Sequence, residues 1–164
     1  AAINLHTNLD VCPGGVNDVL AETLGLTDVS VLNPVGTDAQ GRPYGLIRTG
    51  MVREQRLAEF AAFVKSALSC PGLRFADAGK PVRRVAVGGA IDDVLAAGCD
   101  TLVTADLKYN HFEEAKYRGL NLIDAGHFET ENPVCAVLER VVREALPELT
   151  VLRAKAHKDE TQFL

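Results

Sequence analysis

The sequence predicts an α/β fold in which mixed β-sheets are flanked by helices. The first observation is that short apolar runs alternate with stretches of helical periodicity over residues 84–146, in the order strand, helix, strand, helix, strand, helix. The second is that 164 residues with 47% apolar and 24% charged side chains are enough for one domain with a substantial core. We therefore expect a single domain over residues 1–164.

In the first half of the chain, the sequence predicts short strands and helices. Alternating residues 2–6 predict a strand that ends near Asp10, and Pro13-Gly14-Gly15 predicts a turn before a helix over about residues 16–24. Residues 28–32 predict another strand, and residues 38–49 predict a hairpin that turns at Gly41. Apolar residues at helical spacing predict a helix over about residues 54–69, namely Leu57, Phe60, Ala61, Val64 and Leu68.

The second half predicts longer and more regular elements. Strands are expected over residues 84–87, 101–104 and 120–124, with helices over about residues 90–97 and 109–118 between them. A long helix ending near Leu146 follows, because Pro133 is acceptable in a first helical turn and an apolar stripe continues beyond it. A last strand is expected over residues 150–154.

Composition argues against several classes of protein. The net charge of −5 provides no basic field for nucleic acid, so we do not expect that partner. No segment approaches the roughly 18 uninterrupted apolar residues of a membrane span. The four cysteines are widely spaced, without a Cys-x-x-Cys pair, which indicates free thiols in a cytoplasmic protein.

The main chemical signal is a histidine and a carboxylate four residues apart, a pattern that occurs twice. His127 and Glu131 lie between a predicted strand and the last predicted helix. At this helical spacing the imidazole and the carboxylate share one face and suit a divalent transition metal. A plainer interpretation stays open, in which Glu131 is solvated near the helix N-terminus and His127 packs on the strand. Gly126 would allow close backbone approach, and Asp124 could orient the imidazole as a hydrogen-bond acceptor.

His6 and Asp10 form the second pair, near the carboxyl end of the first predicted strand. The plainer interpretation is that Asp10 bonds to the backbone of the turn before Pro13. If both pairs reach one crevice at the strand ends, Asp10, His127 and Glu131 supply three ligands for one ion, with zinc or iron the expected metal. His6 would then be a fourth ligand or a catalytic proton carrier.

Other common sites lack support in the sequence. Gly88-Gly89 follows a predicted strand, but Ala90-Ile91 provides no third spaced glycine, so NAD or FAD is not expected. The chain has no Gly-x-Ser-x-Gly and no P-loop, which leaves acyl transfer and NTP hydrolysis by those routes unsupported.

Two motifs near the ends of the chain, with three segments between them, match one known pattern. The motifs are His6-Thr7-Asn8-Leu9-Asp10 followed by Pro13-Gly14-Gly15-Val16-Asn17, and Asp124-Ala125-Gly126-His127-Phe128-Glu129-Thr130-Glu131. The segments are residues 45–50, 85–89 and 104–109. In these features the chain resembles the GTP cyclohydrolase 1 type 2 family, also called the Nif-three-like family, over essentially its whole length.

This resemblance implies a Nif-three-like fold and a two-metal site in a toroidal homohexamer built as a trimer of dimers. Residue by residue, Asp10, His127 and Glu131 match metal ligands, with Glu131 the expected bridge between two ions, and His6 matches the motif histidine. The family's other ligands come from a paired-histidine motif in an N-terminal segment that is absent from these 164 residues. The chain therefore resembles the C-terminal two-thirds of a short-form member.

Two functions follow as hypotheses. The first is a metal-dependent hydrolase of GTP or a related nucleotide, in which water attacks the imidazole carbon of the guanine base while His6 or Glu131 moves protons. The alternative is a metal-binding scaffold or regulatory protein that presents a surface to a partner, because the family's other name comes from a protein interaction.

Overall fold

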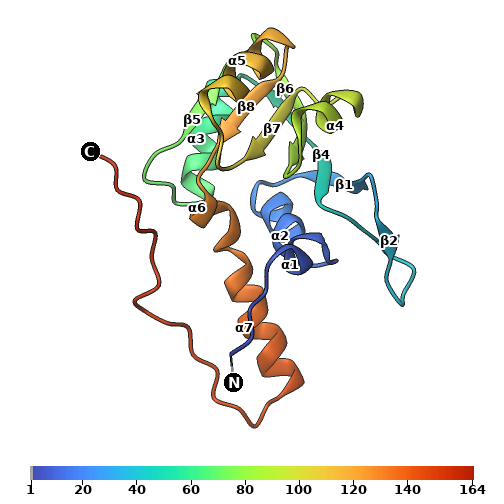
Figure 1. Cartoon of the computed structure of the whole chain (residues 1–164), viewed down its shortest axis with the longest axis vertical. Helices are drawn as coiled ribbons and strands as arrows, with labels where there is room; N and C mark the ends of the chain where they lie inside the picture. The colour runs from blue at the N-terminus through green and yellow to red at the C-terminus, as the bar shows by residue number, and fades with distance from the viewer. Residues whose placement is uncertain (1) are drawn as a thin grey trace.

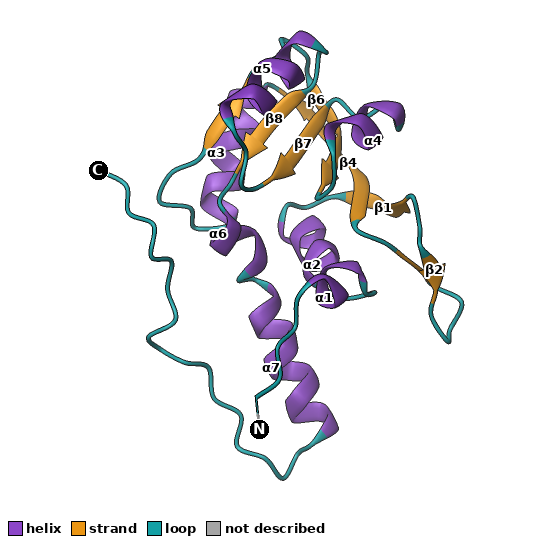
Figure 2. Cartoon of the chain, in the orientation of Figure 1, coloured by secondary structure: helices purple, strands orange, loops and turns teal. Residues whose placement is uncertain are grey.

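The computed structural model describes residues 2–164, which form one six-stranded mixed sheet with helices on both faces (Figures 1 and 2). In spatial order the strands are β1 (Thr27–Leu32), β4 (Ile47–Gln55), β6 (Val82–Val87), β7 (Thr101–Thr104), β8 (Asn121–Asp124) and β5 (Arg74–Ala76). Strands β6, β7 and β8 run parallel, whereas the other neighbouring pairs are antiparallel. The predicted α/β class with a mixed sheet is thus confirmed.

The remaining elements are seven helices and a small hairpin within the described residues. The helices are α1 (Thr7–Val11), α2 (Val16–Thr23), α3 (Leu57–Ala67), α4 (Ile91–Ala96), α5 (Tyr109–Tyr117), α6 (His127–Glu131) and α7 (Val134–Ala145). The hairpin pairs β2 (Gly36–Thr37) with β3 (Pro43–Tyr44) and turns at Gly41, as predicted. None of the helices in residues 2–164 has the length and apolar character to cross a membrane.

Alternation along the parallel strands builds a core on each face of the sheet. On one face Val85, Val103 and Ile123 pack with residues of α2 and α3, including the fully buried Phe60. On the other face Ala86, Leu102 and Leu122 pack with residues of α4 and α5. Since successive side chains of a strand point to opposite faces of the sheet, each of these strands contributes to the core on both faces.

Two predicted strands are wrong. Residues 2–5 are irregular and α1 begins at Thr7, while residues 150–154 lie in an extended tail that runs along the outside of the molecule (Figure 1). Alternation alone does not make a strand, because a strand also needs a partner for its backbone hydrogen bonds. In the described residues the sheet edges are β1 and the short β5, and β5 itself was not predicted.

The long C-terminal helix is divided into α6 and α7 at Asn132 and Pro133. Pro133 has no backbone N–H and therefore cannot continue the hydrogen-bond ladder of α6. Only Val134 of α7 is buried, where it packs with Val16 and Val19 of α2. The division makes α6 a separate turn of helix directly after β8.

Candidate metal centre

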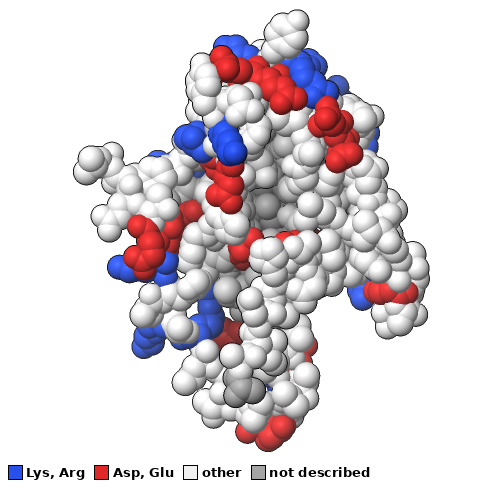
Figure 3. Space-filling view, in the orientation of Figure 1, with Lys and Arg blue, Asp and Glu red and all other residues white. Residues whose placement is uncertain are grey.

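A pocket of about 220 Å³ lies at the carboxyl ends of the parallel strands, where α/β sheets usually bind ligands. Register explains its position: Thr104 pairs with Asp124 and Ala86 with Leu102, so β6, β7 and β8 end at the same edge. The loops after β6 and β7 line the pocket together with Leu46 and parts of α1, α2 and α6. Its polar lining consists of Asp10, Asn17, Thr104, Asp106, His127, Thr130 and Glu131. The face seen in Figure 3 carries charges of both signs and is hollowed near its middle.

His127 is the first residue of α6 and presents both ring nitrogens to carboxylates. Its Nε2 lies 3.0 Å from Oε1 of Glu131, one helical turn further on. Its Nδ1 lies 2.6 Å from Oδ2 of Asp106. The predicted i, i+4 placement of His127 and Glu131 on one helical face is therefore present in the structure.

Gly126 provides the turn into α6. Its φ of +88° belongs to the region that glycine adopts without a steric penalty. A Cβ atom at this position would also collide with the carboxylate of Glu129. Gly126 therefore allows the chain to turn directly from β8 into the helix that carries His127.

Asp106 is a site residue that our sequence reasoning did not single out. It follows β7, has a φ of +59°, and brings its carboxylate against His127 from a separate loop. Its place two residues beyond a predicted strand, at the edge where ligands bind, was the available signal. The role that we considered for Asp124 is taken by Asp106, whose Oδ2 lies against Nδ1 of His127.

Asp124 instead binds backbone groups of the two loops on either side of the His127–Asp106 contact. Its carboxylate accepts hydrogen bonds from the backbone N–H groups of Leu107 and Gly126, each at 3.2 Å, and pairs with the Arg74 guanidinium. Arg74 also donates to the carbonyl oxygen of Leu107 at 2.7 Å. The buried Asp124 thereby ties the Asp106 loop to the loop that precedes His127.

Asp10 lines the same pocket and comes from α1, near the start of the chain. Its backbone carbonyl accepts a hydrogen bond of 3.2 Å from Nδ2 of the buried Asn17. The structure thus brings together three of the predicted residues, Asp10, His127 and Glu131, from segments more than 110 positions apart.

His6 does not line this pocket. It is exposed at the start of α1, where its Nδ1 lies 2.9 Å from the Thr7 hydroxyl. Its backbone N–H donates to Oδ1 of Asn8 at 2.8 Å. His6 is therefore outside the lining that Asp10, His127 and Glu131 share.

The carboxylates around His127 favour its protonated form. The hydrogen bond to Asp106 is the largest cause that raises the pKa of His127 above its ordinary value, and the charges of Glu131 and Asp10 add to it. Partial burial opposes the increase. The pocket is thus a site of concentrated negative charge around one imidazole.

The donor set suits a divalent transition metal, although the side chains are not arranged around an ion. Three carboxylates and an imidazole are ligands that zinc and iron(II) accept. Within residues 2–164, no three His, Cys, Asp or Glu side chains converge closely enough as they stand to enclose a metal. Nδ1 of His127 is hydrogen-bonded to Asp106 and Nε2 forms an ion-pair contact with Glu131, so binding through Nε2 would replace the contact with Glu131. Asp106 would remain on Nδ1, where a carboxylate commonly orients a ligating histidine.

Comparison with known families adds an independent line of evidence. Residues 1–160 match the family model described as Duf34/NIF3 (NGG1p interacting factor 3). A GTP cyclohydrolase 1 type 2 homolog from Nostoc is 38% identical over 147 residues, covering 84% of this chain and 54% of the relative. A homolog of the same name from Clostridium perfringens is 30% identical over 166 residues, covering 97% of this chain and 63% of the relative. The chain thus spans between half and two thirds of the length of these relatives.

Solved structures show the same fold. A hypothetical protein from Staphylococcus aureus superimposes with a TM-score of 0.84 at 26% identity, covering 98% of this chain and 67% of the other. A Bacillus cereus protein related to NIF3 gives a TM-score of 0.81 at 23% identity, covering 97% and 72%. These similarities support the mixed α/β architecture described above.

Proposed function

The chain belongs to the Duf34/NIF3 family, and from this premise we propose that it binds a divalent transition metal in the pocket formed by Asp10, Asp106, His127 and Glu131. We further propose that it acts as a metal-dependent hydrolase of GTP or a related nucleotide. The observation that carries the proposal is the convergence of these four side chains from three separate segments on one pocket. The names of the curated relatives support the choice of substrate class.

Each side chain has a defined part in this proposal. A bound divalent metal would supply a nucleophile at neutral pH by making water more acidic. Asp10, His127 and Glu131 would hold the ion, while Asp106 fixes the ring of His127. Glu131, as a carboxylate in the pocket lining, would also accept and return a proton during hydrolysis. His6, the other predicted proton carrier, lies outside the pocket lining, so His6→Ala tests whether it contributes.

Metal content is the first test. Elemental analysis should find at least one ion per chain in the parent protein, and the ion should be lost in both Asp10→Ala and His127→Ala. His111→Ala is the matched control, because His111 lies on α5 and its Nδ1 accepts a hydrogen bond from the Lys108 backbone N–H. A parent protein that binds no zinc, iron or manganese on titration contradicts the proposal.

Turnover is the second test. GTP hydrolysis should require the metal, stop with a chelator, and fall by roughly 10²–10⁴-fold in Glu131→Gln if this carboxylate transfers a proton. Metal binding that persists in Glu131→Gln together with lost turnover would separate the catalytic role from a ligand role. Metal-independent turnover would contradict the mechanism.

A second candidate function is a non-catalytic metal-binding scaffold or regulatory partner. It is favoured by the family description, which names an interacting factor, and by the His127 ring, whose two nitrogens both face carboxylates. Stoichiometric metal with no turnover of any guanine nucleotide would support it. The family resemblance also leads us to propose a homohexamer, a trimer of dimers that carries up to two ions per site, and light scattering of the purified protein measures that mass directly.

A further inference from the structure

The α1 helix carries Asp10 into the pocket but has little intrinsic stability. It comprises five residues, none of them buried. Isolated helices of this length are not stable in water, because nucleation costs more than one turn recovers. The position of Asp10 must therefore be set by contacts between α1 and the rest of the molecule.

The Leu9 side chain of α1 packs with Val16, Val19 and Val134, and the polar contacts are made to the backbone carbonyls at the C-terminal end of α1. Such carbonyls have no partner inside a helix and need one outside it. The Asp10 carbonyl accepts from Asn17, and Nη2 of Arg48 lies 3.5 Å from the carbonyl oxygens of both Val11 and Cys12. A guanidinium is favourable at this end of a helix because the carbonyls carry partial negative charge.

Arg48 is itself held rigidly. It lies on β4, and its side chain is only 1% exposed. Its Nη1 donates to the Gly45 carbonyl at 2.6 Å, while Nε and Nη2 pair with the two carboxylate oxygens of Asp18 on α2. Asp18 also accepts a hydrogen bond of 2.6 Å from the backbone N–H of Gly14 in the turn between α1 and α2. One guanidinium thus connects β4 to α2 and to the end of α1.

From this network we infer that Arg48 is the positioning residue for Asp10. Arg48 does not line the pocket, so its effect passes through the backbone of α1. The fork of the guanidinium reaches all of these acceptors at once, and a lysine ammonium in its place cannot do so. The consequence for ligand binding rests on the proposed metal site, whereas the consequence for α1 does not.

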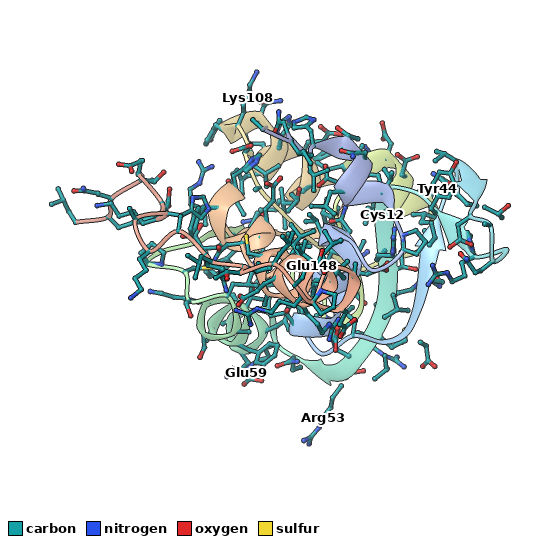
Figure 4. All side chains as sticks on the ribbon, turned by 90° about the horizontal axis from the view of Figure 1, so that it is seen from below. Cys12, Tyr44, Arg53, Glu59, Lys108 and Glu148 are labelled. Atoms are coloured by element: carbon teal, nitrogen blue, oxygen red, sulfur yellow. The ribbon has the colours of Figure 1, made fainter. Side chains whose placement is uncertain are left out.

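Hydrogen exchange of the metal-free protein tests the structural step. In Arg48→Lys, the amides of Gly14, Gly15 and Gly45 should exchange at least about tenfold faster than in the parent. Gly15 and Gly45 donate to the carbonyls at the end of α1, and Gly14 donates to Asp18, the ion-pair partner of Arg48. Amides of β7 and β8 in the same sample should be unchanged. Arg53→Ala is the control, since Arg53 lies on the same strand and extends away from the body of the protein (Figure 4). Equal exchange at these glycines in Arg48→Lys and the parent overturns the inference.

Metal titration tests the functional step. Arg48→Lys should weaken manganese binding by about 10–100-fold, the usual effect of losing a group that orients a ligand, and Arg53→Ala should not. In Arg48→Ala, millimolar ethylguanidinium should restore part of the affinity, which loss of general stability would not allow. If Arg48→Ala does not fold, the lysine variant decides.

The two possible failures are distinguishable. A parent that binds no metal contradicts the proposed function and leaves the exchange experiment as the test of Arg48. A parent that binds metal with the same affinity as Arg48→Lys overturns the role of Arg48 and leaves the proposed function standing.

Discussion

Nδ1 of His127 lies 2.6 Å from Oδ2 of Asp106, and this contact joins the loop after β7 to the start of α6, which follows the neighbouring parallel strand β8. A proton on Nδ1, donated to Asp106, leaves Nε2 as the nitrogen that faces Glu131 and that becomes available to a ligand once its own proton is released. The carboxylate therefore sets both the orientation and the tautomer of the ring, which are the properties that a ligating histidine needs.

Asp106→Asn should lower the pKa of His127. The parent value is expected above the ordinary pKa, mainly because of the hydrogen bond to Asp106, and the amide removes the charge that favours the imidazolium. Asparagine tolerates the positive φ at this position, so the loop should keep its shape. NMR titration of the metal-free protein measures the pKa. Asp92→Asn, which changes an exposed carboxylate paired with Arg118, is the control and should leave the His127 pKa in place.

The raised pKa of His127 also gives a direction to the pH dependence of stability. A group with a higher pKa in the folded state stabilises the fold fully below its unfolded pKa, about 6.5, and loses that contribution as pH rises through the folded value. The free energy of unfolding of the parent should therefore fall across this window relative to that of Asp106→Asn. If urea unfolding gives the two proteins the same dependence of the free energy of unfolding on pH, the hydrogen bond to Asp106 is not the cause of this effect.

Asp124→Ala should destabilise the protein more than Arg74→Ala. Removing the buried carboxylate leaves the Leu107 and Gly126 amides without their acceptor, at a cost of about 1–3 kcal/mol for each group that stays buried and unpaired. Arg74 is 60% exposed, so its removal leaves a carboxylate that still accepts two backbone hydrogen bonds. Urea unfolding of both variants gives the comparison. Equal losses would show that the ion pair, and not the hydrogen bonds to the backbone, accounts for the stabilisation.

The parts of the fold that sequence reasoning recovered are those in which local pattern and tertiary environment agree. The apolar alternation of β6, β7 and β8 reflects a sheet covered on both faces, and the spacing of Leu57, Phe60 and Val64 reflects one buried face of α3. In contrast, residues 2–6 show the alternation of a strand but have no neighbouring strand to pair with. Strand β5 is too short to show a periodic pattern of apolar residues.

The same distinction applies to the candidate site: sequence reasoning found the pair set by local geometry and missed the long-range contacts. His127 and Glu131 are separated by one helical turn, so their proximity follows from local geometry. Asp106 and Arg48 act through contacts that span 21 residues or more, and no local pattern predicts such pairs. Whether Asp10, His127 and Glu131 bind metal together stays a prediction for the titrations described above.

Gly126→Ala should cost more than Gly98→Ala. Both glycines have positive φ, so both substitutions strain the backbone, and at Gly126 the combination of φ +88° with ψ 142° lies outside the left-handed helical region. The new methyl group finds open space at Gly98, but at Gly126 it meets the carboxylate of Glu129. The free energies of unfolding of the two variants give the difference, to which the backbone conformation of Gly126 and the contact with Glu129 both contribute. Metal affinity should fall only in Gly126→Ala, because that turn places His127, and an equal decrease in Gly98→Ala would contradict this reason.

Phe60→Ala and Phe63→Ala provide a matched test of the core beneath the site. The two rings stack with centroids 6.2 Å apart on α3, yet Phe60 is fully buried whereas Phe63 is 43% exposed. Truncation of Phe60 leaves a cavity against the sheet and should cost about 3–5 kcal/mol. Phe63→Ala should cost much less, because solvent fills the space and its side chain loses little buried area. Chemical denaturation measures both values, and similar losses would show that the packing of α3 on the sheet is not the main source of stability on this face.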